Sequence, residues 1–273
     1  MVSQEQRRRQ LAREKFLRQQ QRRTSARRRA RMRNSVIASV LGVIVIGSVA
    51  LYTTGVLKND DKANASSETT PSASPSASKA PDPCEKAAAG SVKKLSWKKE
   101  PAMSIDTSAD YTMKLATTCG DIGIALKTAA APHTVNSFDF LAAKGFFDHT
   151  KCHRLTTNGI YVLQCGDPTG TGSGGPGYTI PDENLKDKSL KGGVYPAGTV
   201  AMANTGQKHT GGSQFFLVYQ DSQLPPSYTP FGTIDAAGLK VLKKIAAAGE
   251  NTGQGDGAPN ATVVIDKATV TKS

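Results

Sequence analysis

Arg154 is the only arginine in residues 34–273, although that stretch carries many lysines. The other twelve arginines of the chain all lie in residues 1–33. Lysine and arginine carry the same charge, but only arginine offers a planar guanidinium that stays protonated and donates several hydrogen bonds in a fixed fork. A solitary arginine therefore indicates a site that needs this fork for a reacting group. A structural salt bridge and an accident of residue usage are the alternatives.

Arg154 belongs to a series of short motifs that follow one another along the chain. The series consists of His153-Arg154, Gln164 to Asp167, Met202 to Asn204, Gly212 to Phe216, and Phe231-Gly232. This order resembles the cyclophilin family of peptidyl-prolyl cis-trans isomerases over residues 108–273, and the Gly-Ser-Gln-Phe-Phe block is its most specific part. The resemblance implies a closed eight-stranded antiparallel β-barrel capped by two helices.

The reaction implied by the resemblance is rotation about an X–Pro peptide bond. Amide resonance gives this rotation a barrier of about 18–20 kcal/mol. Twisting the amide returns a lone pair to the prolyl nitrogen, so a hydrogen-bond donor aimed there stabilises the twisted state more than either planar state. By the resemblance Arg154 is that donor, and Gln164 is a second catalytic residue that holds the substrate backbone by hydrogen bonds. No bond breaks, so we expect neither a cofactor nor a metal ion.

The resemblance also implies a groove for the proline and its neighbours. The prolyl ring is expected in an apolar cup formed by Tyr161, Met202, Phe216 and Leu224. The remaining substrate contacts are assigned to Ala203, Asn204, Gln214 and, at the rim, Tyr228. Because side chains alternate along a strand, Phe216 should line the groove beside Gln214, while Phe215 fills the core.

Two departures from the family pattern affect these assignments. The spacing between Arg154 and Gln164 is two residues longer than usual in the family. Counting back from Gln164 selects Tyr161 for the cup, but Ile160 takes that place if the insertion falls elsewhere. Gln223 stands where cyclosporin-binding members carry Trp, so we expect weak cyclosporin binding.

Two other kinds of site are suggested by residue types and disfavoured by context. Residues 170–175 match G-x-G-x-x-G, but Pro176 and Gly177 follow in place of a helix, and no βαβ unit surrounds them. Residues 149–165 also hold the elements of a zinc site, namely His149, Cys152, His153 and Cys165. The two histidines would share a face only on a helix, whereas the resemblance places them at a strand.

The four cysteines allow three disulfide pairings. The resemblance pairs the strands of Cys152 and Cys165 in a hairpin, which favours a bridge between them. Cys84 and Cys119 would then join the segment that enters the domain to its first turn. Disulfides persist in exported domains, so this pairing is the one we expect.

Residues 1–34 form a basic arm, followed at residues 35–57 by a run without charge. At about 1.5 Å per residue, this run is long enough to cross a hydrocarbon core about 30 Å thick. The basic flank predicts a cell-membrane protein with a cytoplasmic N-terminus, one transmembrane helix and an extracytoplasmic domain. A buried core helix is the alternative for this run.

The basic arm is expected to contact anionic lipid headgroups. Residues 34–273 carry 22 basic and 20 acidic residues, so the domain lacks the overall positive charge of a nucleic-acid-binding protein. A nucleic-acid tail is therefore the less favoured interpretation of the arm.

The rest of the chain divides by composition and periodicity. Residues 58–83 indicate a Ser/Pro/Ala-rich linker, and residues 84–107 an N-terminal extension of the domain at 108–273. Helices are predicted over 132–144 and after Asp235, the second capped by that residue. A hairpin and short strands are predicted over 111–126, 152–156, 161–165, 199–203, 213–218, 229–234 and 262–270. The fold class is therefore mainly β.

Together these features predict a monomeric, membrane-anchored prolyl isomerase that acts on Pro-containing segments of exported proteins. One alternative is a cyclophilin-fold module that binds such segments without turning them over. Another is an anchored assembly protein that works through its basic arm.

Overall fold

The computed structural model describes residues 81–273, which fall within a compact unit spanning residues 75–273. The predictions for the basic arm, for the membrane span at 35–57 and for most of the linker lie outside the described residues. Among residues 81–273, no helix has the length and apolar character needed to cross a membrane.

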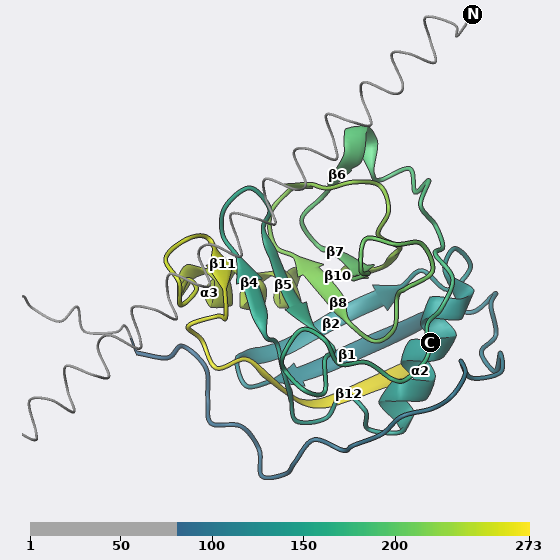
Figure 1. Cartoon of the computed structure of the whole chain (residues 1–273), viewed down its shortest axis with the longest axis horizontal. Helices are drawn as coiled ribbons and strands as arrows, with labels where there is room; N and C mark the ends of the chain where they lie inside the picture. Colours follow the sequence, from purple (N-terminus) through teal and green to yellow (C-terminus); the bar gives the residue numbers. More distant parts are fainter. Residues whose placement is uncertain (1–80) are drawn as a thin grey trace, which may run out of the picture. The chain divides into compact units, whose positions relative to one another are not determined.

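One antiparallel sheet of ten strands dominates the described unit (Figure 1). Its strand order is β11-β4-β5-β8-β7-β10-β2-β1-β12-β3, and a separate two-stranded sheet pairs β6 with β9. The prediction of a mainly β fold is confirmed. The strands are β1 (Tyr111–Thr117), β2 (Gly120–Leu126), β3 (Thr150–Lys151), β4 (Arg154–Thr156), β5 (Val162–Cys165), β6 (Val194–Tyr195), β7 (Thr199–Met202), β8 (Phe215–Val218), β9 (Ser222–Gln223), β10 (Pro230–Ile234), β11 (Asp256–Gly257) and β12 (Val264–Lys272).

The expected closed barrel of eight strands is not found in the described residues. The sheet is a half-barrel whose end strands, β11 and β3, do not pair with each other. β3 and β4 are consecutive in the chain, and the two residues between them bond to different segments, one directly before β12 and the other in β5. Cys152 N donates to Val263 O (3.0 Å), whereas His153 N donates to Gln164 O (3.1 Å). The chain therefore crosses here from one end of the sheet to the other, and the hydrogen-bonded pairing of strands is interrupted.

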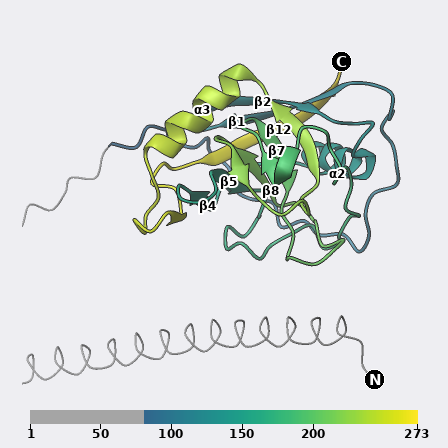
Figure 2. The ribbon, with the colours of Figure 1, turned by 90° about the horizontal axis from the view of Figure 1, so that it is seen from above.

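Within residues 81–273, two helices cover the sheet, as predicted. α2 (Pro132–Ala143) begins with a proline and packs on β12, while α3 (Ala236–Ala247) packs on β2. The carboxylate of Asp235 accepts a hydrogen bond from Gly238 N (2.6 Å), which confirms the predicted cap. Figures 1 and 2 show α2 and α3 at opposite ends of the sheet. A 3₁₀ turn, η1 (Lys191–Gly193), precedes β6.

Phe138 of α2 lies at the centre of the aromatic core. Its ring centroid is 4.5 Å from that of Phe231, 5.2 Å from that of Phe147 and 5.5 Å from that of Phe215. All four rings are fully buried. This cluster joins α2 to β10 and to β8, and β8 is one of the strands that carry the site described below.

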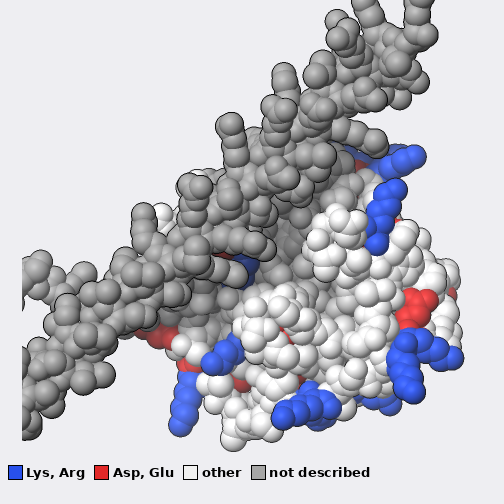
Figure 3. Space-filling model, in the orientation of Figure 1, with Lys and Arg blue, Asp and Glu red and all other residues white. Residues whose placement is uncertain are grey.

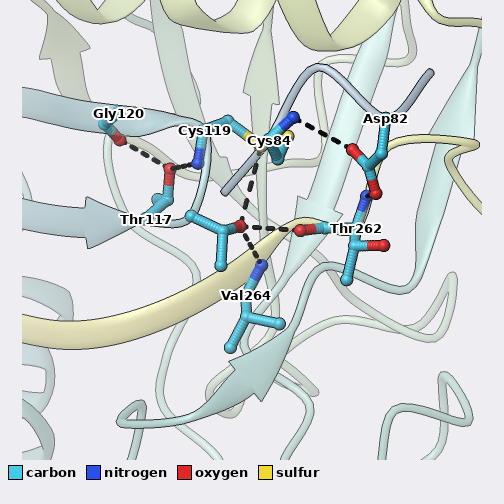
Figure 4. The surroundings of a disulfide bond; sticks show 8 residues. Asp82, Cys84, Thr117, Cys119, Gly120, Thr262 and Val264 are labelled. Atoms are coloured by element: carbon cyan, nitrogen blue, oxygen red, sulfur yellow. Dashed lines mark hydrogen bonds between the residues drawn. A yellow bond between two sulfur atoms is a disulfide. The ribbon is translucent and has the colours of Figure 1, made fainter. Parts of the chain in front are cut away.

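Both predicted disulfides are present, Cys84–Cys119 and Cys152–Cys165. The second bridge engages both thiols that a zinc ion at this place would need. Cys84–Cys119 joins the extension to the turn between β1 and β2 (Figure 4). Beside it, Asp82 accepts from Cys84 N (3.0 Å) and from Thr262 N (2.9 Å), so the entering chain is also held to the segment before β12.

The extension packs against α2 and runs toward it from the bridged turn (Figure 1). The Trp97 ring lies 5.0 Å from that of Phe140 and 6.1 Å from that of Phe146. Further along, Asn136 Nδ2 donates to the carbonyls of Pro101 (3.3 Å) and Ala102 (3.1 Å). The extension is therefore an ordered part of this unit.

Candidate functional site

Four side chains form one row across neighbouring strands. Arg154 of β4 pairs with Gln164 of β5, Gln164 pairs with Phe216 of β8, and Phe216 pairs with Ala201 of β7. Residues directly opposite one another on paired strands share a face of the sheet. The register therefore places a cation, an amide and an aromatic ring side by side on one surface.

The guanidinium of Arg154 is held along one edge by Asp256. Nε donates to Oδ1 (2.7 Å) and Nη2 to Oδ2 (2.8 Å), while Nη1 donates to Gln164 Oε1 (3.1 Å). The hydrogen bonds with Asp256 raise the pKa of Arg154, and those from Arg154 lower the pKa of Asp256. An arginine has five N–H donors. Within residues 81–273, two of those of Arg154 remain without a partner.

This ion pair lies at the surface, with the two side chains 37% and 53% exposed. The predicted alternative of a structural salt bridge is therefore present in the structure, but it occupies only one edge of the fork. The other edge faces Gln164 and the row beyond it.

Asp256 is a site residue that sequence reasoning missed. It belongs to β11, where it pairs with Thr156 of β4, 102 residues from Arg154 along the chain. The preceding loop is organised by Glu250, whose carboxylate accepts from Thr252 N (2.6 Å) and Gly255 N (2.8 Å). The glycine-rich sequence of residues 253–257 indicates a loop, but no sequence signal connects it with Arg154.

A chain of hydrogen bonds continues from Arg154 through two side-chain amides. Gln164 Nε2 donates to Gln214 Oε1 (2.8 Å), and Gln214 Nε2 donates to Gly174 O (2.9 Å). Each amide accepts on its oxygen and donates from its nitrogen, so its orientation is fixed. The predicted residues Arg154, Gln164 and Gln214 are thus brought together.

An apolar cluster separate from the main core lies along the same face. Val162 is two residues before Gln164, and Val218 is two residues after Phe216, so alternation puts both on the side of the row. The ring of Phe216 lies 5.4 Å from that of Tyr228. The buried members are Val162, Tyr195, Ala201, Phe216, Val218 and Leu224, and Ile160, Leu190, Ala203 and Tyr228 pack against them. We call this set the apolar cup.

Met202 and Tyr161, both predicted for the cup, lie elsewhere. Met202 pairs with Phe215, is 3% exposed and packs in the main core. Alternation along β7 accounts for this, because it turns Ala201 and not Met202 toward the cup. Tyr161 packs on the main core with its ring 5.9 Å from that of Tyr219, and Ile160 contacts the cup in its place.

The other predicted members of the groove are brought together. Phe216, Leu224, Tyr228 and Ala203 belong to the cup or pack on it. Val162 was missed, although counting two residues back from Gln164 identifies it. Gln223 lies apart, exposed on β9, with its amide donating to Gly192 O (2.8 Å). The expectation of weak cyclosporin binding stays a prediction.

A cavity of about 1120 Å³ opens beside Gln164 and Gln214. Ala203 and Asn204 line one part of it, residues 172–179 a second part, and residues 98–100 of the extension a third. Asn204 Nδ2 donates to Ser227 O (2.8 Å), which holds this side chain toward the segment before Tyr228.

Asp167 fixes the loop that forms the second part of the cavity wall. This buried carboxylate accepts from Thr169 N (2.7 Å) on one oxygen and from Gly172 N (2.6 Å) on the other. Burial would raise the pKa of Asp167, but the hydrogen bonds from Thr169 and the loop amides outweigh it, and the pKa is lowered. The carboxylate is therefore ionised, and the loop is folded around it.

Comparison with known proteins places these features in a family context. Residues 112–270 match the family model described as "Cyclophilin type peptidyl-prolyl cis-trans isomerase/CLD". A relative from Mycobacterium leprae named "Probable peptidyl-prolyl cis-trans isomerase B" is 53% identical over 166 residues, which cover 58% of this chain and 56% of the relative. "Peptidyl-prolyl cis-trans isomerase B" of Bacillus subtilis is 42% identical over 118 residues, which cover 43% of this chain and 77% of the relative.

Part of this chain is also similar to a second mycobacterial protein and to a solved structure. The Mycobacterium tuberculosis protein with the same name as the M. leprae relative is 50% identical over 165 residues, which cover 58% of this chain and 53% of the relative. The chain thus spans a little over half the length of the two mycobacterial relatives. A crystal structure of a Cryptosporidium parvum cyclophilin-type isomerase aligns with a TM-score of 0.49 at 25% identity, covering 60% of this chain and 99% of that one.

Proposed function

Because this chain belongs to the family of cyclophilin-type peptidyl-prolyl cis-trans isomerases, we propose that it accelerates rotation about X–Pro bonds and that Arg154 stabilises the twisted amide. One observation carries the proposal. A guanidinium with unpartnered N–H donors stands in register with an apolar cup on the same face of the sheet.

The mechanism follows from this arrangement. The prolyl ring enters the cup over Phe216, where apolar contacts hold it while the preceding carbonyl swings. As the amide twists, a free N–H of Arg154 donates to the lone pair that appears on the prolyl nitrogen, and Gln164 keeps the fork in position. The donor binds the twisted state more strongly than the planar states, which lowers the barrier. No proton is transferred, because the raised pKa of Arg154 keeps it a cation.

The test is to measure isomerisation and binding of one Pro-containing peptide together. NMR exchange spectroscopy on the full chain in detergent gives the cis-trans rate, and a titration in the same tube gives the affinity. We expect exchange that accelerates with protein concentration and saturates with peptide. Binding without acceleration would favour the alternative of a module that captures Pro-containing segments. The absence of both binding and acceleration would reject the isomerase and the binding module alike.

Asp256→Asn is expected to lower kcat/KM by roughly three- to tenfold, which corresponds to about 0.7–1.4 kcal/mol of transition-state stabilisation. The carboxylate holds two donors of Arg154, one on each oxygen, and asparagine replaces one of these oxygens with an NH2 group that cannot accept. Most of the loss should appear in kcat, because the apolar cup is untouched. Asp121→Asn, at an exposed ion pair with Lys114, is the matched control. Equal activity of the two variants would contradict a positioning role for Asp256.

The same pair predicts how activity depends on pH. The pKa of Asp256 is lowered, so its bond to Arg154 is lost only as the pH falls through that lowered value. The pKa of Arg154 is raised. The pair therefore stays ionised between about pH 5 and pH 9, and kcat/KM of the wild-type protein should be flat across that range. A bell-shaped profile measured by the same exchange method would show that proton transfer contributes.

We also propose that residues 35–57 anchor the chain in the cell membrane with the isomerase domain outside, where it acts on exported proteins. The uncharged run and the basic flank support this orientation, and so do the two disulfides, which persist in oxidising compartments. Protease added to intact cells should remove the domain and spare the basic arm, and a chain lacking residues 1–57 should leave the membrane fraction. Recovery of the full chain in the soluble cytoplasm would overturn the proposal. The contact of the arm with anionic lipid and the monomeric state stay predictions.

A further inference from the structure

Two lysines that precede the family match line the cavity beside the site. Lys98 and Lys99 belong to the extension, whereas the match begins at residue 112. Both lysines share the cavity with Gln164 and Gln214, the two amides that connect it to Arg154. A polypeptide that crosses the apolar cup and passes these glutamines therefore meets the extension next.

The segment that carries the lysines is fixed against the cavity wall. Trp97 N donates to Pro176 O (2.8 Å), and the Trp97 ring packs against Phe140. The extension approaches the wall closely at Gly177, whose φ is +89°. A β-carbon there would lie 2.2 Å from Ser96 Oγ and 2.6 Å from Trp97 O. Only glycine fits this contact, so the backbone directly before the two lysines is held against the cavity wall.

Among the described residues that line the cavity, positive charge exceeds negative charge. Among the described residues, neither Lys98 nor Lys99 has a hydrogen-bond or ion-pair partner. Within residues 81–273, the only acidic residue in the lining is Glu100, whose Oε1 lies 3.3 Å from His133 Nδ1. The two carboxylate oxygens of Asp167 accept hydrogen bonds from Thr169 N and Gly172 N of the loop that forms part of the cavity wall. Among the described residues visible in Figure 3, basic side chains stand apart around a mainly uncharged centre.

We infer that this cavity receives a carboxylate side chain of the substrate polypeptide, so that Lys98 and Lys99 give the isomerase a preference for Asp or Glu near the proline. An extended chain advances about 3.3–3.6 Å per residue, so a side chain two or three positions from the proline reaches past Gln164 and Gln214. The inference rests on the proposed function, because it places the proline in the apolar cup.

The test compares three sets of peptides that differ only in charge. Each has the same length and one proline, with Glu, Ala or Lys two or three positions before or after it. We expect kcat/KM of the full chain in detergent to be about fivefold higher for Glu than for Ala at one of these positions, and lower for Lys. The preference should fade between about 0.05 M and 0.5 M salt, because exposed charges are screened.

The double variant Lys98→Glu with Lys99→Glu should reverse the order of the peptides, and Lys94→Glu should leave it unchanged. Lys94 is an exposed lysine of the same extension that does not line the cavity. The Ala peptide reports on the proposed function by itself, and thermal melts confirm that each variant folds. Affinities of the same peptides by NMR titration measure the charge preference even without turnover. Equal values for the Glu, Ala and Lys peptides, or a preference that survives in the double variant, would overturn the inference.

Discussion

Replacing Arg154 with alanine is expected to lower kcat/KM for a Pro-containing peptide by about 100- to 1000-fold, the usual loss when one preorganised donor to a transition state is removed. The guanidinium is the only cation in the row formed with Gln164, Phe216 and Ala201. Without it, nothing in that row donates to a prolyl nitrogen except an amide already committed to Gln214. The peptide should still bind, because the apolar cup is unchanged, so the loss should fall on kcat.

Arg154→Lys separates charge from shape. An ammonium keeps the positive charge but cannot both bind Asp256 through two parallel bonds and reach toward Gln164, as the fork does. We therefore expect this variant to remain strongly impaired in the NMR exchange assay. Both variants should melt close to the wild-type temperature, because exposed ion pairs contribute little to stability. Wild-type rates in the alanine variant would reject the role assigned to Arg154.

Replacing Phe138 with alanine is expected to lower the free energy of unfolding by about 3–5 kcal/mol, the range measured for large aromatic residues in cores. Phe138 is fully buried and contacts the rings of Phe147, Phe215 and Phe231. These contacts come from separate elements, so the cavity left behind cannot be filled by the movement of one neighbour. Urea unfolding of residues 75–273 under non-reducing conditions measures the change.

Phe138→Leu is the control for size and should be the milder change, because most of the volume and the apolar surface are kept. The alanine variant should also lose isomerase activity at temperatures where it begins to unfold, since Phe215 precedes the cup residue Phe216. A difference of less than about 1 kcal/mol between wild type and Phe138→Ala would show that the cluster contributes far less than its burial indicates.

Local sequence signals predicted the regular elements well. The helical spacing and the cap at Asp235 gave both helices, because an amphipathic pattern and a capping carboxylate act over a few residues. The row from Arg154 to Phe216 was predicted through motifs. Closure of the barrel was not predicted correctly, since the interruption between β3 and β4 depends on which strands Cys152 and His153 meet.

The structure differs from the sequence assignments at the site for two physical reasons. Met202 was assigned to the cup from its position in a motif, although strict alternation along β7 turns Ala201 to that side and Met202 to the core. Asp256 and the two cavity lysines were missed for a different reason. Their contacts with the site join segments that are far apart in the chain. Neither the composition of a segment nor the periodicity of its apolar residues indicates such contacts.

The Cys152–Cys165 bridge has a consequence for how this surface opens. It joins the segment just before β4 to β5 beside the Arg154–Gln164 pair, with Cys152 two residues before the arginine and Cys165 directly after the glutamine. A covalent tie at that point stops the hairpin from fraying there, so local unfolding has to start from a less constrained neighbour. The short β11 segment is such a neighbour, since it pairs with β4 through only two residues. Excursions of this kind would release Asp256 before they separate the arginine from its glutamine.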